Sequence, residues 1–326
     1  LDFKSNAYYR NYDVNKYTAF VNNDLIWMPG SYITQNGYLN TIEGMLKNTN
    51  YEAKNTTDLK TSGTVSEISS VVSFKSSLPM EKNSINYAET FSPTFMVRYA
   101  PGQMKNRRDD DVFLNYSNLY SLNKTGEIES GLSTILGFDY KLSKNGQNSS
   151  KSEKLSISMG QIFNQKKNKD LPMKSSLDQK MSDLVGSVNY NFSEIGNIGY
   201  SFSLDNNYSD LNYNEITTGL DFGKIAFNLD YLEQRNHIGN EHYVNSGVTL
   251  NINESSSLGF ATKKNFKTDS TELYNINYQY EIDCLTAGLV FRREFYNDSD
   301  LEEKDSLMFV IKFVPFTGAS APLIKP

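Results

Sequence analysis

Apolar and polar residues alternate along most of the chain with a period of two. The clearest stretch runs from Leu184 to Phe192, and the alternation resumes from Ile198 to Leu204 after a turn that contains Gly196. A period of two indicates β-strands with one apolar face. The short turn between the two stretches predicts that they pair as a hairpin.

The same pattern predicts about 16–17 strands along the chain, most of them close to ten residues long or longer. We expect these strands at about 2–12, 16–29, 35–50, 65–78, 86–100, 111–122, 130–143, 154–165, 184–192, 198–204, 215–223, 224–234, 242–253, 257–267, 274–282, 284–296 and 306–316. Soluble strands average about five or six residues, so a soluble sandwich or propeller is the weaker alternative.

The connections between the predicted strands alternate in kind. Some are short turns, such as 221–224, and others are long polar excursions, such as 102–110 and 166–180. Short turns on one side and long loops on the other are typical of a transmembrane β-barrel. We therefore expect an all-β, antiparallel transmembrane β-barrel whose polar strand faces line a watery interior.

Composition narrows the choice further. The chain has 32 Lys and Arg against 38 Asp and Glu, which gives a net charge of -6 and makes nucleic acid an unexpected partner. Its 22 Tyr and 19 Phe favour strands. The longest apolar run, 307–311, is far shorter than the roughly 20 residues of a membrane helix.

Residues that carry catalysis are scarce. The two histidines, His237 and His242, lie between predicted strands without the spacing of metal ligands, and we expect a solvated loop there. Nucleophile and phosphate-binding motifs at a strand-to-helix junction are lacking. The carboxylates at 109–111 and 298–303 do not have the spacing of a calcium loop and are expected to be charged loops, with weak cation binding as the alternative. We expect neither an enzyme nor a cofactor.

The last predicted strand is apolar on both faces and ends in an aromatic residue. One face carries Leu307, Phe309, Ile311 and Phe313, and the strand ends at Phe316. An aromatic-terminated last strand resembles the segment that the barrel-assembly machinery of outer membranes recognises. A buried sandwich strand is the alternative.

Two blocks of sequence resemble the lipopolysaccharide-assembly outer-membrane protein family, LptD. The first is 92–101 followed by 118–124, Asn-Leu-Tyr-Ser-Leu-Asn-Lys, where the family has approximately Asn-Leu-Phe-Ser-Leu-Asn-Arg. The second consists of 280–295 and 305–313, which resemble the family's closing strands. A shorter match, 182–186, resembles a strand start of the family, so the resemblance spans most of 92–316.

This resemblance implies a transport function in the outer membrane of a Gram-negative bacterium. Lipopolysaccharide would be inserted into the outer leaflet, with an LptE-like plug lipoprotein and the periplasmic Lpt bridge as partners. Barrels of the family have about 26 strands. We therefore expect residues 1–316 to be the C-terminal part of such a barrel and 317–326 to be a short tail. A general porin is the alternative function.

The resemblance also assigns roles to individual residues. The last strand, with Leu307 and Phe316 near its ends, would form one half of a lateral gate between the first and last strands of the barrel. The single cysteine, Cys284, corresponds to a family position that pairs with cysteines outside this chain, which implies one half of a periplasmic disulfide. A free thiol on a strand is the alternative.

Overall fold

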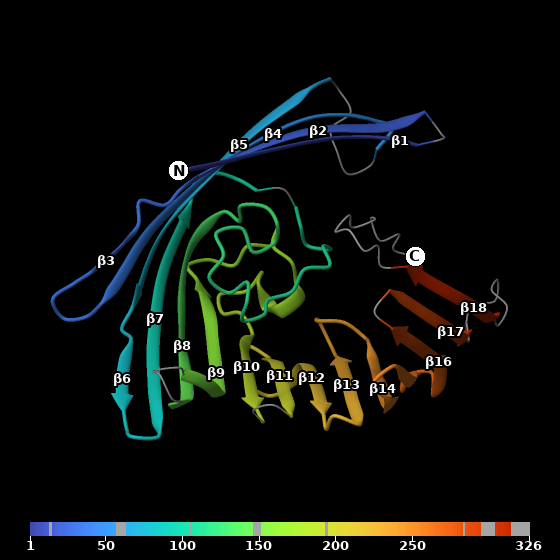
Figure 1. Ribbon diagram of the computed structural model, residues 1–326. Helices are drawn as coiled ribbons and strands as arrows, with labels where there is room; N and C mark the ends of the chain where they lie inside the picture. Colours follow the sequence, from blue (N-terminus) through green and yellow to red (C-terminus); the bar gives the residue numbers. More distant parts are fainter. Residues whose placement is uncertain are drawn as a thin grey trace. The chain divides into compact units, whose positions relative to one another are not determined.

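The chain folds almost entirely into β-strands. The computed structural model describes residues 1–12, 15–56, 63–104, 106–145, 151–192, 195–282, 284–294 and 304–313 (Figure 1). Their strands belong to one 18-stranded sheet. The strands are β1 (Asp2–Tyr12), β2 (Lys16–Trp27), β3 (Ser31–Ile33), β4 (Leu39–Lys54), β5 (Val65–Ser77), β6 (Met80–Asn83), β7 (Tyr87–Ala100), β8 (Gly131–Asn145), β9 (Lys151–Asn164), β10 (Leu184–Asn191), β11 (Gly196–Leu204), β12 (Leu211–Asp221), β13 (Ile225–Gln234), β14 (His242–Asn253), β15 (Ser256–Asn265), β16 (Ser270–Ile282), β17 (Leu285–Glu294) and β18 (Lys304–Phe313).

The strands confirm the predicted fold class. Pairs in register are antiparallel, as between β7 and β8, and β4 has 16 residues where about 9–11 are enough to cross a bilayer. The described helical element is a 3-10 turn, η2 (Lys174–Ser176). Among the described residues, no helix is long and apolar enough to span a membrane.

The strand prediction is wrong at one segment and incomplete at two. Residues 111–122 form turns instead of a strand, and the short strands β3 and β6 were not predicted. At the first segment, Asn118 Oδ1 accepts the N–H of Asn115 at 2.9 Å, and Asn115 Oδ1 accepts the N–H of Asn118 at 3.0 Å. Such local bonds from side chain to backbone favour turns over a strand ladder.

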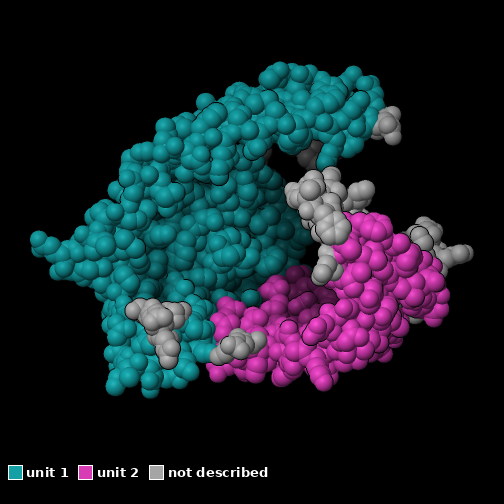
Figure 2. Space-filling view, in the orientation of Figure 1, with its two compact units in different colours: residues 1–188, 201–212, 236–239 teal, residues 189–200, 213–235, 240–326 magenta. Residues whose placement is uncertain are grey.

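The chain divides into two compact units (Figure 2). Unit 1 comprises Leu1–Val188, Ser201–Asn212 and Asn236–Gly239. Unit 2 comprises Asn189–Tyr200, Tyr213–Arg235 and Asn240–Pro326.

Unit 2 shows how the alternation sorts side chains by face. One row across six strands, in register, contains Phe227, Val248, Phe260, Ile276, Phe291 and Leu307. A parallel row contains Ile225, Leu250, Leu258, Tyr278, Leu289 and Phe309. A row on the opposite face contains Asn228, Gly247, Ala261, Asn275, Arg292 and Ser306. We call the apolar face the outer face and the more polar one the inner face.

In unit 1, one face of β7, β8 and β9 carries the hydrophobic core, and we call it the inner face of this unit. Two long connections, which we call the 101–130 segment and the 165–183 segment, fold back beside β7, β8 and β9 (Figure 1). The buried core joins Met96, Ile135 and Ile162 of the strands to Leu114, Leu119, Leu122 and Ile128 of the first segment and Leu171 and Leu177 of the second. The expectation that the polar strand faces line a watery interior is therefore wrong for this face of unit 1, because folded connections cover these strands.

Candidate functional site

Arg98 of β7 holds the 101–130 segment against the inner face. Its buried guanidinium donates from Nε and Nη2 to the carbonyl of Leu122, at 2.9 and 2.6 Å, and from Nη1 to the carbonyl of Glu129, at 2.8 Å. Nη2 also lies 3.0 Å from the Glu129 carboxylate. A buried cation is costly unless it is paired and hydrogen-bonded, so this arginine fixes both ends of the turn between 122 and 129.

A second cation holds the tip of the same turn. Nζ of Lys47, on β4, donates to the carbonyl of Gly126 at 3.0 Å and lies 2.9 Å from the Glu127 carboxylate. Within the segment, Arg107 reaches the same carboxylate at 3.1 Å. The segment is thus tied to two strands through charged side chains as well as through its apolar core.

Two glycines form the seat of the family-like block 118–124. Gly137 of β8 faces Gly160 of β9 in register. A Cβ on Gly137 would overlap the Tyr120 hydroxyl and the Met159 carbonyl, and a Cβ on Gly160 would overlap the Leu119 side chain and the Leu136 carbonyl. Only glycine leaves room for this close approach of the segment to the sheet.

A pair of tyrosines lies beside this seat. The rings of Tyr116 and Tyr120 meet edge to face, with 6.1 Å between centroids. Burial raises the pKa of Tyr120 to about 12, and burial together with a hydrogen bond to Asp139 raises the pKa of Tyr116 further. Both phenols therefore stay neutral, and with Asp139 they line a polar cavity of about 500 Å³.

The 165–183 segment is fixed by a buried carboxylate. Asp183 accepts hydrogen bonds from Ser176 Oγ at 2.7 Å and from Ser203 Oγ at 3.2 Å, and its Oδ2 lies 2.7 Å from His237 Nε2. The hydrogen bond with Asp183 raises the pKa of His237 above its ordinary value. The predicted solvated loop is therefore wrong for His237, which ties a third connection to this segment.

These residues also form the one group in the described part of the chain whose spacing could hold a metal ion. Ligand atoms of Asp183, Asp205 and His237 lie within 4.8 Å of one another. Asp183 already has three hydrogen-bond partners, and one of them is the imidazole. The geometry is that of a carboxylate–imidazole pair that holds two loops together.

In the described part of the predicted acidic loops, two carboxylates form ion pairs. Asp110 pairs with Arg107 at 2.7 Å, and Asp111 pairs with Lys174. The second acidic stretch, 298–303, lies outside the described residues. The first loop is thus a charged loop with internal partners, in line with the main expectation for it.

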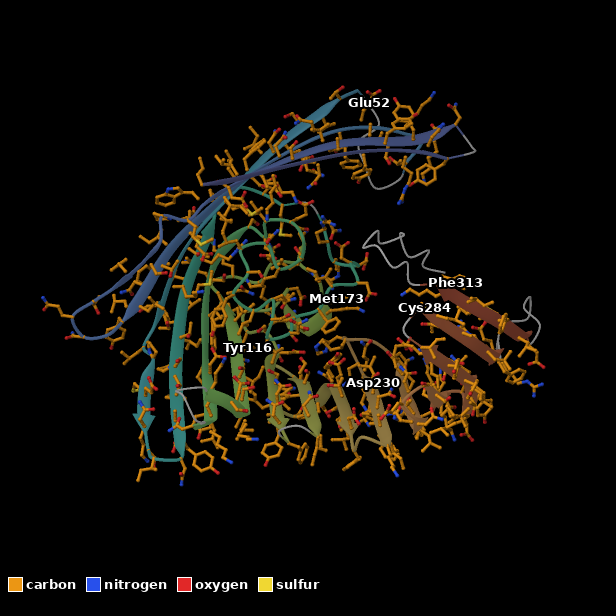
Figure 3. The ribbon with its side chains drawn as sticks, viewed as in Figure 1. Glu52, Tyr116, Met173, Asp230, Cys284 and Phe313 are labelled. Carbon is orange, nitrogen blue, oxygen red and sulfur yellow. The ribbon has the colours of Figure 1, made fainter. Side chains whose placement is uncertain are left out.

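The remaining predicted site residues lie in unit 2. Cys284 is a half-buried free thiol next to β17, in the short connection that follows β16. Leu285 pairs with Phe313, so Cys284 and the C-terminal end of β18 lie at the same end of these paired strands (Figure 3). Leu307 and Phe309 occupy the two outer-face rows, and Phe316 lies outside the described residues.

Long antiparallel strands, an exposed apolar outer face and an inner face that carries polar rows and folded connections together define a membrane-spanning β-barrel protein. A match to a family model identifies which family of β-barrel proteins this is. The model for LptD, LPS transport system D, matches residues 28–278, and the chain belongs to this family.

Membership of the family settles the general function. The protein transports lipopolysaccharide and inserts it into the bacterial outer membrane, and it is a transport barrel instead of an enzyme. The sequence-based predictions of family, transport function and outer-membrane location are confirmed.

Solved structures with some similarity are porins. Two triple mutants of a porin from Rhodopseudomonas blastica give TM-scores of 0.33 and 0.32 at 11% and 10% identity, and a mutant of the same porin with five substitutions gives 0.34 at 11% identity. Each alignment covers 96% of this chain and 100% of the porin chain. No curated protein matches the sequence.

Proposed function

We propose that β18 forms one half of a lateral gate through which lipopolysaccharide leaves the barrel. In this proposal, residues 1–316 are the C-terminal part of a larger barrel, and 317–326 are a tail. Strands that precede β1 in the complete barrel would supply the other half of the gate. The barrel-assembly machinery would recognise the same strand during biogenesis.

The exposure of β18 is the observation that supports this proposal. Phe309 is 68% exposed, whereas Leu289, Tyr278 and Leu258, in the same outer-face row, are 40–46% exposed. Inner-face positions of the strand are exposed as well, with Met308 at 46%. Among the described residues, β18 pairs in register with β17, and its side chains are more exposed than those of the strands before it, which suits a strand that pairs weakly and separates.

A photo-crosslinking amino acid at Ile311 tests the gate in the intact protein in its membrane. Tyr280 is the matched control, because the register through Ala287 places it in the same row on β16. We expect lipopolysaccharide adducts from position 311 and not from position 280. Equal adducts at both positions, or none at 311, would contradict a gate at β18.

We further propose that an LptE-like lipoprotein covers the inner face of unit 2 and that the periplasmic Lpt bridge delivers lipopolysaccharide through a domain outside this chain. Inner-face side chains such as Asn228 and Asn277 are polar and exposed, and they suit a polar protein surface. A photo-probe at Asn277 should capture the lipoprotein, and one at the neighbouring outer-face residue Ile276 should not. The reverse pattern would reject this placement.

Depletion of the protein tests the transport function as a whole. Lipopolysaccharide should accumulate in the periplasm when the protein is withdrawn. A general porin would not produce this effect, so normal surface lipopolysaccharide after depletion would reject the transport function for this chain.

A further inference from the structure

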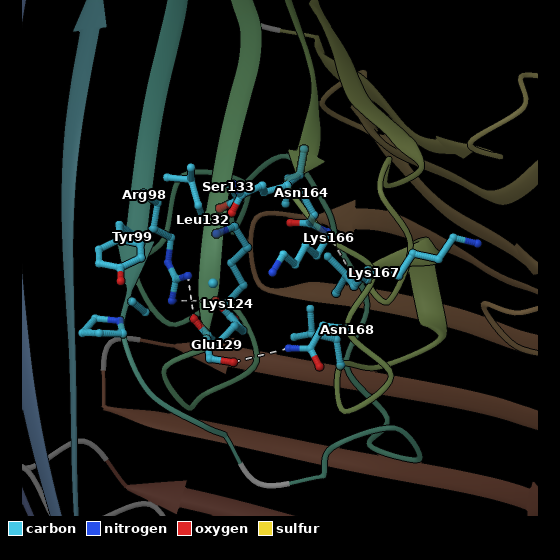
Figure 4. Close-up of a pocket in the computed structure, with 18 of the residues that line it drawn as sticks. Arg98, Tyr99, Lys124, Glu129, Leu132, Ser133, Asn164, Lys166, Lys167 and Asn168 are labelled. Carbon is cyan, nitrogen blue, oxygen red and sulfur yellow. Dashed lines mark hydrogen bonds and ion pairs between the residues drawn. The ribbon is translucent and has the colours of Figure 1, made fainter.

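A cavity of about 350 Å³ opens between the start of β8, the end of β9 and the two folded segments of unit 1. This volume falls within the range of small-molecule sites. Its polar lining includes Ser130, Ser133, Asn164 and Asn168, and its charged lining is shown in Figure 4. The cavity lies beside the Arg98 anchor and is separate from the cavity at the two tyrosines.

The charge of the lining is opposite to that of the chain. Four cationic side chains, Arg98, Lys124, Lys166 and Lys167, line the cavity together with one carboxylate, Glu129. The whole chain carries a net charge of -6. Arg98 is neutralised by its ion pair with Glu129. The Lys167 side chain points away from the other lining residues (Figure 4), so Lys124 and Lys166 provide the excess positive charge within the cavity.

Lys124 is the central feature of this lining. Its side chain is 9% exposed, and Nζ donates to the carbonyl of Ser121 at 3.0 Å. Among the ion pairs of the described residues, none includes Lys124, Lys166 or Lys167. Burial lowers the pKa of Lys124 to about 8. The Glu129 carboxylate favours the charged form of Lys124, but it is already paired with Arg98. Burial therefore prevails, and the ammonium is unfavourable unless a further anion accompanies it.

Lys166 lies at the mouth of the cavity, with its side chain directed toward the lining residues (Figure 4). It is exposed, whereas Lys124 is deep. An anion that entered the cavity would thus meet an ammonium at the entrance and another at the base, with amide and hydroxyl groups between them. Lysine ammonium groups bind phosphate as compact point charges.

We propose that this cavity binds a phosphoryl group carried on a sugar. The proposal deepens the transport function, on which it rests, because it assigns to the folded segments a site for the phosphorylated saccharide portion of the transported lipid. The hydroxyl and amide groups of the lining would accept and donate hydrogen bonds to the sugar ring. The charge excess would hold the phosphate.

Calorimetric titration of the intact protein in detergent tests this site with three probes: glucosamine 1-phosphate, glucosamine and inorganic phosphate. We expect saturable binding of the sugar phosphate, no binding of the unphosphorylated sugar, and at least tenfold weaker binding of inorganic phosphate. Equal affinity for inorganic phosphate and the sugar phosphate would overturn the saccharide assignment, and absence of saturable binding would overturn the site.

Variants assign the binding to named residues. Lys124→Met should weaken binding of glucosamine 1-phosphate at least tenfold, and Lys166→Gln should weaken it several-fold. Lys169→Gln, an exposed lysine of the same segment that does not line the cavity, should leave the affinity unchanged. Because Lys124 is buried, Lys124→Arg keeps the charge as a second variant and should retain part of the affinity. Unchanged affinity in both Lys124→Met and Lys166→Gln would place the binding elsewhere.

The pH dependence gives an independent readout. Lys124 faces the charged groups of Arg98 and Glu129 and loses its proton as the pH rises through about 8. Affinity for glucosamine 1-phosphate should fall over this range, and Lys124→Arg should remove this fall. A wild-type affinity that does not change across this range would overturn the role of Lys124. Surface delivery of lipopolysaccharide distinguishes the two levels of failure: an anion site that fails while delivery remains normal rejects only this site, whereas normal delivery after depletion rejects the transport function itself.

Discussion

At two positions, Gly137 and Gly160, the lack of a side chain decides whether the 101–130 segment can pack against the sheet. Gly137→Ala should destabilise unit 1 by about 1–3 kcal/mol, because the added Cβ would overlap both the Tyr120 hydroxyl and the backbone carbonyl of Met159. Urea unfolding of the protein in detergent measures this. Gly219→Ala, on β12, is the matched control, since a Cβ there meets nothing within 4 Å. Equal effects of the two substitutions would show that strand propensity, and not the seat, sets the cost.

The pair of His237 and Asp183 should make the packing of the loops depend on pH. The pKa of His237 is raised in the folded state by Asp183, with further support from Asp205 and Asp178. The charged pair therefore contributes its full stability below the ordinary histidine pKa of about 6.5 and loses it as the pH rises through the raised value.

Limited proteolysis at the connection between β13 and β14 measures this dependence. Cleavage should become faster as the pH rises, and His237→Gln should remove most of the change. His242→Gln, on β14, changes the other histidine and should leave the pH dependence in place. A wild-type profile that is flat, or one that survives His237→Gln, would contradict the prediction.

Cys284 carries a separate prediction. In the complete protein from an oxidising periplasm, it should be disulfide-bonded to a cysteine outside this chain. Cys284→Ser should therefore change mobility on a non-reducing gel and leave mobility on a reducing gel unchanged. Unaltered mobility of the oxidised form would mean that this position does not have the pairing implied by the family.

At the scale of the element, the assembly of β18 depends on which of its side chains face lipid. Phe309 lies in an outer-face row. Lys312, which pairs with Thr286, lies on the opposite, inner face of the same strand. Phe309→Asp should place a charge in hydrocarbon, at a cost of up to about 3 kcal/mol, and should reduce the folded, heat-modifiable form on gels. Lys312→Gln should assemble normally. Normal assembly of Phe309→Asp would show that this face does not meet lipid.

The alternation of side chains was sufficient to predict most strands, because each strand is sorted by one local rule. Residues 111–122 alternate just as well, yet they form turns, since Asn115 and Asn118 bond the backbone and the apolar side chains have a core within reach. Short strands such as β6 have too few residues to show a period.

The folded site could be predicted only in outline. The sequence block 118–124 was identified through a resemblance, but its contacts with Gly137 and Arg98 depend on pairings between distant parts of the chain. Asp183 lies in the block 182–186, which resembles a strand start, and nothing local marks it as the partner of His237, 54 residues later. Such long-range choices follow from the sheet register, which the pattern alone leaves open.

At the scale of the whole molecule, the 101–130 segment should act as an obstruction on the inner face. Replacement of residues 106–129 with a short glycine-serine linker should remove the apolar core contributed by Leu114, Leu119 and Leu122. Cells that carry the variant should become more permeable to large antibiotics, as measured by growth inhibition. Unchanged permeability, with normal amounts of the variant in the outer membrane, would mean that another element blocks passage.

The pairing of Gly137 with Gly160 imposes an order on assembly. The 101–130 segment is synthesised before β8 and β9, but its seat exists only once those two strands lie in register. The leucines of the segment can therefore pack against the sheet only after β8 and β9, which come later in the chain, have paired. Docking of Leu119 and Tyr120 is then a late event that depends on correct register, because a slip of one residue between β8 and β9 would move one of the two glycines to the opposite face and remove the space for these side chains.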